Sequence, residues 1–160
     1  MEIRLKDRVG VINQNKKYKI NKAFVKKIVF GILKCLKKNK GAELEFVFLD
    51  DKAIRGLNRR FKGKNSATDV LSFGLDGPEF GIEKFFGEIF ISLDAARRNS
   101  KIFKTKFEDE ICRYVIHGIL HLFGFNDETP PEKRRMAKKE DDILKRLCAK
   151  EDLSKVLTRR

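Results

Sequence analysis

The sequence predicts an α+β fold in which one small mixed β-sheet is backed by helices. Segments with the alternating or β-branched apolar pattern of strands all lie before residue 95, and from residue 106 onward the chain carries only helical patterns. Apolar residues make up 41% of the 160-residue chain, which is enough to bury one hydrophobic core without disulfide bonds. We therefore expect a single domain over residues 1–160.

Strand and helix patterns alternate in the first part of the chain. Residues 2–13 alternate loosely between apolar and polar and can hold one or two short strands. A helix is expected between its N-cap, Asn21, and Gly41. Its apolar stripe at helical spacing consists of Phe24, Ile28, Ile32 and Leu36. Residues 42–51 alternate again and predict a strand. One face of that strand carries Leu44, Phe46 and Phe48.

The following segments predict a short helix and then two strands. Residues 51–61 have a helical pattern that Asp50 or Asp51 can cap. Residues 68–75 and 88–94 are apolar and β-branched, which predicts a strand in each. The stretch between these two strands has the composition of a hairpin or an excursion from the sheet.

Two helices are expected in the last third of the chain. One runs from about Lys106 to Phe123, and Gly124 can end it in a left-handed conformation. The other begins near Pro130 and Pro131, because proline is favoured in the first turn of a helix. Its apolar residues are Met136, Ile143, Leu144 and Leu147.

The charge of the chain indicates a polyanionic partner. The 37 basic and 23 acidic residues give a formal net charge of +14. A basic surface of this size attracts nucleic acid by displacing its condensed counterions. The alternative is the solvated, Lys/Glu-rich surface of a heat-adapted protein.

The cysteines and the first residues indicate where the protein acts. Cys35, Cys112 and Cys148 are odd in number, lie far apart and form no CxxC pair. We therefore expect buried, reduced thiols rather than a disulfide framework or a cysteine zinc site. The first residues lack the apolar segment of a secretory signal, and no apolar run approaches the length of a membrane span. These features predict a cytoplasmic protein without membrane association.

The stretch HGILHLFGFND contains both histidines of the chain and is a candidate metal site. His117 and His121 are four residues apart, so on a helix both side chains can face one ion. The chain can then reverse after Gly124 and return Asp127 to the same ion. Two imidazoles and one carboxylate would leave a fourth position open, as catalytic zinc requires. The alternative is a pair of histidines packed in the core or lying on a solvated helix face.

Three blocks of the sequence resemble the YbeY-type single-strand endoribonucleases of ribosomal RNA maturation. HGILHLFGFND is similar to that family's HGxLHLxGYDH, and LNRRFKGKNSATDVLSF (57–73) is similar to LNxxYRxKDxPTDVLSF. GEIFISLD (87–94) is similar to GDIxIS, and MAKKEDDIL (136–144) is a further match. The blocks occur in consistent order over roughly residues 20–147.

The resemblance implies an α+β metalloenzyme that cleaves single-stranded RNA. It implies a role in maturing the 3′ end of small-subunit rRNA and in ribosome quality control, with rRNA and the small ribosomal subunit as partners. His117 and His121 match the first two of three zinc-binding histidines, and the third histidine falls on Asp127. Carboxylate oxygen also binds zinc, although its charge shifts preference toward harder divalent metals.

A basic segment is expected to bind the substrate. The family's arginine after the LN pair falls on Lys62, which the resemblance implies as the catalytic phosphate-binding residue. A lysine can hold a phosphate as a point charge but lacks the two-pronged guanidinium. The neighbouring residues that are expected to share RNA binding are Arg59, Arg60 and Lys64.

Two other function classes remain open from the sequence. A non-catalytic RNA- or ribosome-binding factor, with a structural metal or none, accounts equally well for the positive charge. A metal-dependent peptidase is the function that the HxxxH spacing of the two histidines would indicate by itself. The peptidase motif HExxH needs a glutamate base after its first histidine, however, and Gly118 stands there.

Overall fold

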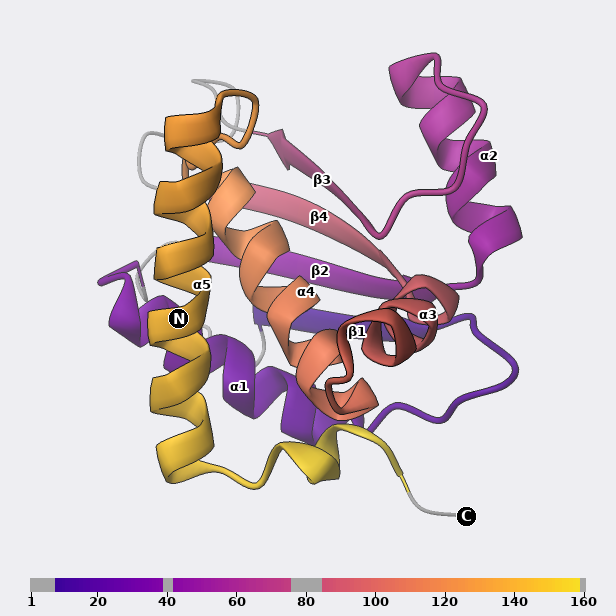
Figure 1. Ribbon diagram of the computed structural model, residues 1–160. Helices are drawn as coiled ribbons and strands as arrows, with labels where there is room; N and C mark the ends of the chain where they lie inside the picture. The colour runs from indigo at the N-terminus through magenta and orange to yellow at the C-terminus, as the bar shows by residue number, and fades with distance from the viewer. Residues whose placement is uncertain (1–7, 39–41, 76–84, 159–160) are drawn as a thin grey trace.

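The computed structural model describes residues 8–38, 42–75 and 85–158. Within these residues the strands form one four-stranded sheet in the order β1-β2-β4-β3. Neighbouring strands are parallel except β3, which pairs antiparallel with β4 (Figure 1). The predicted small mixed sheet is confirmed. The strands are β1 (Val9–Asn13), β2 (Ala42–Leu49), β3 (Val70–Leu75) and β4 (Phe85–Ser92).

Helices cover both faces of the sheet. The larger core lies between one face and a helical layer in which α4 crosses the sheet and α1 and α5 flank it (Figure 1). The predicted shared face of Leu44, Phe46 and Phe48 on β2 is confirmed, and all three residues belong to this core. A smaller cluster on the other face joins α2 to the sheet through Ile54 and Leu71. The helices are α1 (Lys22–Cys35), α2 (Asp51–Lys62), α3 (Leu93–Phe103), α4 (Phe107–Leu122), α5 (Pro130–Lys150) and the short 3-10 helix η3 (Leu153–Val156).

The helix starts follow from capping side chains. The side chain of Asn21 accepts a hydrogen bond from the backbone N–H of Phe24, as predicted for the start of α1. Asp50, rather than Asp51, caps α2. Thr129 caps α5, and the two prolines occupy its first turn, as expected. Gly41 and the stretch 76–84, where a hairpin or excursion was expected, lie outside the described residues.

Helix α3 was missed by the sequence analysis, which expected a strand up to residue 94 and nothing regular before Lys106. The strand ends at Ser92, whose hydroxyl accepts a hydrogen bond from the backbone N–H of Ala95 and so caps a helix. Ser92 followed by Asp94 in the first turn was the available signal.

The cysteines are free in the structure, but they are not all buried as expected. Cys112 is buried, Cys35 is half-buried and Cys148 is exposed. Burial raises the pKa of the Cys112 thiol well above its ordinary value, so this thiol is unreactive in the folded chain. Among the described residues, no helix combines the length and the apolar character that crossing a bilayer requires.

Gly118 allows α4 to lie directly on the sheet. A Cβ atom at this position would come within 2.6 Å of Ile89 Cγ2 and within 3.3 Å of Ser72 Oγ. The Ser72 hydroxyl also donates a hydrogen bond of 3.0 Å to the Gly118 carbonyl. This close contact therefore fixes the distance between the sheet and the part of α4 that carries His117 and His121.

We expect Gly118→Ala to lower the free energy of unfolding by about 1–3 kcal/mol, because the added methyl overpacks a rigid β-branched neighbour. Urea denaturation measures this effect. Gly56→Ala is the matched control, since a Cβ on this exposed helical glycine meets nothing within 4 Å. The control should raise stability by about 0.5–1 kcal/mol. A Gly118→Ala variant as stable as the parent chain would contradict the close packing described here.

Candidate metal centre

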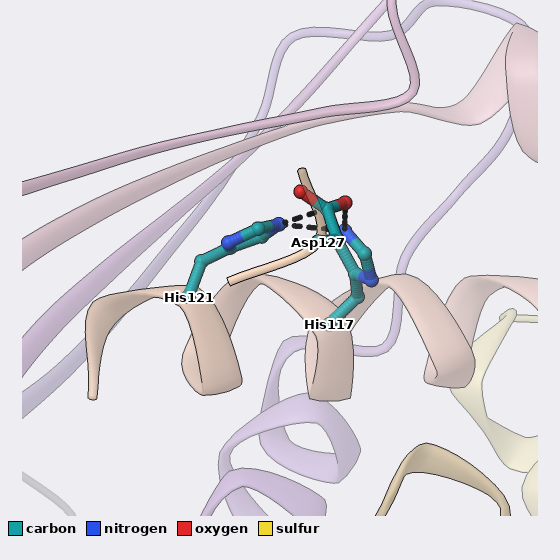
Figure 2. Close-up of side chains that lie close together, drawn as sticks. All are labelled: His117, His121 and Asp127. Atoms are coloured by element: carbon teal, nitrogen blue, oxygen red, sulfur yellow. Dashed lines mark hydrogen bonds and ion pairs between the residues drawn. The ribbon is translucent and has the colours of Figure 1, made fainter. Parts of the chain in front are cut away.

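His117 and His121 lie on successive turns of α4 and face each other. Their Nε2 atoms are 3.0 Å apart and their ring centroids 4.5 Å apart (Figure 2). Both side chains are about one-quarter exposed, at 24% and 29%. The histidines therefore stand at the edge of the core, where a ligand from solvent can reach them.

The end of α4 brings Asp127 back to these histidines. Gly124 adopts a φ of +91°, a conformation that glycine tolerates without strain. The N–H of Phe125 bonds to the Leu120 carbonyl and the N–H of Gly124 to the His121 carbonyl, which together form a Schellman motif. The chain reverses, and Asp127 Oδ2 lies 3.4 Å from His121 Nε2 and 3.7 Å from His117 Nε2. The predicted left-handed end of the helix is confirmed.

The geometry of these three side chains fits a divalent metal. Tetrahedral bonds of about 2.0–2.2 Å place ligand atoms about 3.3–3.6 Å apart. The measured separations of 3.0, 3.4 and 3.7 Å bracket that range. His117, His121 and Asp127 form the one such cluster found among the described residues. A metal ion held by these three side chains would keep one coordination position open for substrate or water.

Glu140 on α5 completes the surroundings of His117 and was not identified from the sequence. Its carboxylate accepts a hydrogen bond from His117 Nδ1–H, and the residue is only 8% exposed. This bond fixes the tautomer in which Nε2 carries the lone pair and points toward Asp127. Glu140 was detectable as a charged residue within the apolar stripe of α5, one turn after Met136. Its partner was not detectable, because His117 lies on another helix.

Arg113 connects this carboxylate to the surface. Its guanidinium lies 3.5 Å from Glu140 and 2.8 Å from Asp141. Burial lowers the pKa of His117, but the hydrogen bond and the negative charge of Glu140 outweigh this effect and raise the pKa overall. Protonation of His117 would therefore compete with metal binding at this residue.

Lys62 lies near the other histidine. Lys62, Ser72 and His121 line one pocket of about 300 Å³, in which no described lining residue is a carboxylate. The Lys62 ammonium group also lies 5.6 Å from the centre of the Phe73 ring. This pocket offers an anion a positive side chain beside the candidate metal position. The other predicted RNA-binding residues are exposed at the end of α2 and in the turn after it: Arg59, Arg60 and Lys64.

The structure also explains why position 118 carries no base. A Cβ atom at Gly118 would point at Ile89, Ser72 and Val70 of the sheet. A glutamate there would clash with the sheet, so the HExxH arrangement of a peptidase cannot be built on this helix. The peptidase alternative loses its structural basis.

Comparison with solved structures agrees with the described fold. The solution structure of TM1509 from Thermotoga maritima superposes with a TM-score of 0.59 and covers 88% of this chain and 89% of that one. Sequence identity between the two is 23%, so this similarity concerns the fold.

Three curated relatives, each named endoribonuclease YbeY, are similar in sequence. The chain is 34% identical to endoribonuclease YbeY of Syntrophus aciditrophicus over 85% of this chain and 87% of the relative. It is 32% identical to the protein of that name from Clostridium perfringens over 87% and 96%. It is 42% identical to the Anaeromyxobacter sp. relative over 65% of this chain, but only 54% of that longer protein is aligned. The family model described as endoribonuclease YbeY matches residues 10–148. The chain therefore belongs to the YbeY family.

Proposed function

We propose that this protein is a metal-dependent endoribonuclease that cleaves single-stranded RNA in rRNA processing, at the 3′ end of small-subunit rRNA, and acts in ribosome quality control. The observation that supports the proposal is the convergence of two imidazole nitrogens and one carboxylate oxygen, 3.0–3.7 Å apart, beside a pocket lined by Lys62. Names of the relatives and the net charge of +14 support RNA as the substrate. The small ribosomal subunit is the proposed partner.

Zinc is the proposed metal, held by His117, His121 and Asp127. Two neutral imidazoles and one carboxylate with an open position are a donor set of catalytic zinc. The ion would supply Lewis acidity that polarises a phosphoryl oxygen or a water. Other divalent metals are compatible with the carboxylate oxygen of Asp127.

Side chains of the protein would orient the metal ligands and bind the RNA. Glu140 holds the His117 ring with Nε2 directed at the site. Lys62, on the His121 side, would bind a phosphate oxygen and offset the charge that builds up on the phosphoryl oxygens of the pentacoordinate transition state. The RNA backbone next to this phosphate would be held by Arg59, Arg60 and Lys64. Because these contacts are electrostatic, the affinity for RNA should fall as the salt concentration rises.

Cleavage of a labelled single-stranded rRNA fragment tests the proposal. The chain should cut this RNA, lose activity with a chelator and recover it when zinc is added back. A duplex of the same sequence should resist cleavage. Cleavage that continues unchanged in chelator would contradict a metal-dependent mechanism.

We expect Lys62→Ala to lower kcat/KM for this RNA by about 100-fold, the size of effect that loss of one transition-state donor has. Lys62→Arg should retain activity, because a guanidinium also binds phosphate oxygens. The control is Lys52→Ala, which removes the same charge from an exposed residue in the first turn of α2. Equal losses in Lys62→Ala and Lys52→Ala would show that only general charge attraction had been removed.

A non-catalytic rRNA-binding factor is the second candidate, and one observation favours it. Asp127 stands at the position of the third histidine in the YbeY motif, and this change is compatible with a metal that is structural rather than catalytic. This candidate predicts rRNA affinity that a chelator leaves unchanged, together with no cleavage. The chelator experiment therefore separates the two functions.

A further inference from the structure

A second pocket, separate from the one lined by Lys62, borders the candidate metal centre. It has a volume of about 470 Å³, within the range of about 300–1,000 Å³ that is typical of small-ligand sites. His117 and Asp127 form part of its wall, whereas His121 lines the pocket that contains Lys62. The two pockets share no lining residue, so the metal position lies between two separate compartments.

The two compartments differ in charge. Besides Asp127, the larger pocket is lined by three carboxylates, those of Asp69, Glu110 and Glu140, and by two cations, Arg113 and Lys133. Arg113 is already paired with Glu140 and Asp141. A phosphate group would be repelled here and attracted to the Lys62 side. The larger pocket suits a neutral group that donates hydrogen bonds.

The larger pocket also presents aromatic surface. Phe103, the last residue of α3, lines it and is 66% exposed, so most of its surface is free for contact. Tyr114 also lines the pocket, is 5% exposed and accepts a hydrogen bond from the side chain of Asn99. Asn99 itself lines the pocket and has a carbonyl oxygen that can accept hydrogen bonds. Flat aromatic surface beside acceptor groups matches the faces and the N–H edges of a nucleobase.

We propose that this pocket binds the nucleobase next to the scissile phosphate, with the base stacked on Phe103 and its amino or ring N–H groups facing the carboxylates. The inference rests on the proposed RNA cleavage and specifies how that substrate lies. The phosphate occupies the Lys62 side, and the adjacent base enters the carboxylate side. A base paired in a duplex cannot be turned into such a pocket without unpairing, which gives a physical reason for single-strand preference.

The test pairs a protein variant with a substrate variant. Phe103→Ala is compared with the parent chain on an intact RNA and on two RNAs that are abasic on the 5′ or the 3′ side of the cut. Loss of one base–aromatic stack should lower kcat/KM by about 5–100-fold on the intact RNA. On one of the abasic RNAs, Phe103→Ala should cause no further loss. Phe103→Trp should restore cleavage of the intact RNA, because the indole ring can also stack.

Ile102→Ala is the matched control. Ile102 is 63% exposed, precedes Phe103 in α3 and is absent from the wall of the pocket. Ile102→Ala should leave the cleavage of all three RNAs unchanged. Equal losses for Phe103→Ala on intact and on both abasic RNAs, or no loss on any of them, would overturn the base pocket while leaving the nuclease function intact. Failure of the parent chain to cleave the intact RNA would instead overturn the proposed function, and the base pocket with it.

Discussion

His121→Ala is expected to lower the affinity for zinc by more than about 100-fold, because loss of an outer hydrogen-bond partner alone already costs about 10–100-fold. RNA cleavage should fall to background in the same variant. In the proposed site His121 supplies one of the three ligand atoms, and its Nε2 lies within 3.4 Å of the other two. His117 and Asp127 alone would not hold the proposed ion in a fixed position beside Lys62. Competition with a coloured chelator measures the affinity.

The fold should survive this substitution. His121 is at the end of α4 and 29% exposed, so its removal leaves a solvent-accessible space rather than a closed cavity. Circular dichroism and thermal unfolding of the metal-free proteins should match between variant and parent. Zinc affinity equal to that of the parent, in a correctly folded variant, would show that His121 is not a ligand.

Glu140→Ala is expected to lower zinc affinity by about 10–100-fold, although Glu140 does not face the metal position. The substitution removes the acceptor of the His117 Nδ1–H bond, so the ring can rotate and change tautomer. Glu140→Gln should have a smaller effect, because its amide oxygen can still accept that hydrogen bond without the charge. Chelator competition and the absorption spectrum of the cobalt-substituted protein report affinity and ligand geometry separately from activity.

Asp141→Ala provides the control for Glu140. Asp141 is the next residue of α5, its side chain is 65% exposed and it pairs with the same arginine. Its loss should leave zinc affinity and the cobalt spectrum unchanged. If Asp141→Ala weakens zinc binding as much as Glu140→Ala does, the effect comes from Arg113 and not from orientation of His117.

Local patterns were sufficient to predict most of the fold. Alternation identified β2, the capping residue Asn21 identified the start of α1, and two prolines identified the start of α5, because these features depend on contacts within a few residues. The strand order was not predictable. Strand β4 pairs with β2 in parallel and with β3 in antiparallel orientation, and such pairing depends on contacts between distant parts of the chain. Helix α3 was missed because a strand runs directly into its cap at Ser92.

The candidate site was also predictable only where it depends on local sequence. The spacing of His117 and His121 and the position of Gly124 are local, so the sequence predicted a cluster of two histidines and Asp127 that the structure brings together. Glu140 contacts His117 across 23 residues and from another helix, which no local pattern reports. The pocket that ends at Phe103 also required the packing of three helices to be known.

Metal content per chain tests the central claim most directly. Plasma mass spectrometry on tag-free protein, with Asp127→Ala purified in parallel, measures zinc and the other divalent metals together. We predict about one metal ion per parent chain, as a single site of three ligands holds, and a marked loss in the variant. Absence of metal from both proteins after exposure to zinc, or equal metal in both, would contradict a site built from His117, His121 and Asp127.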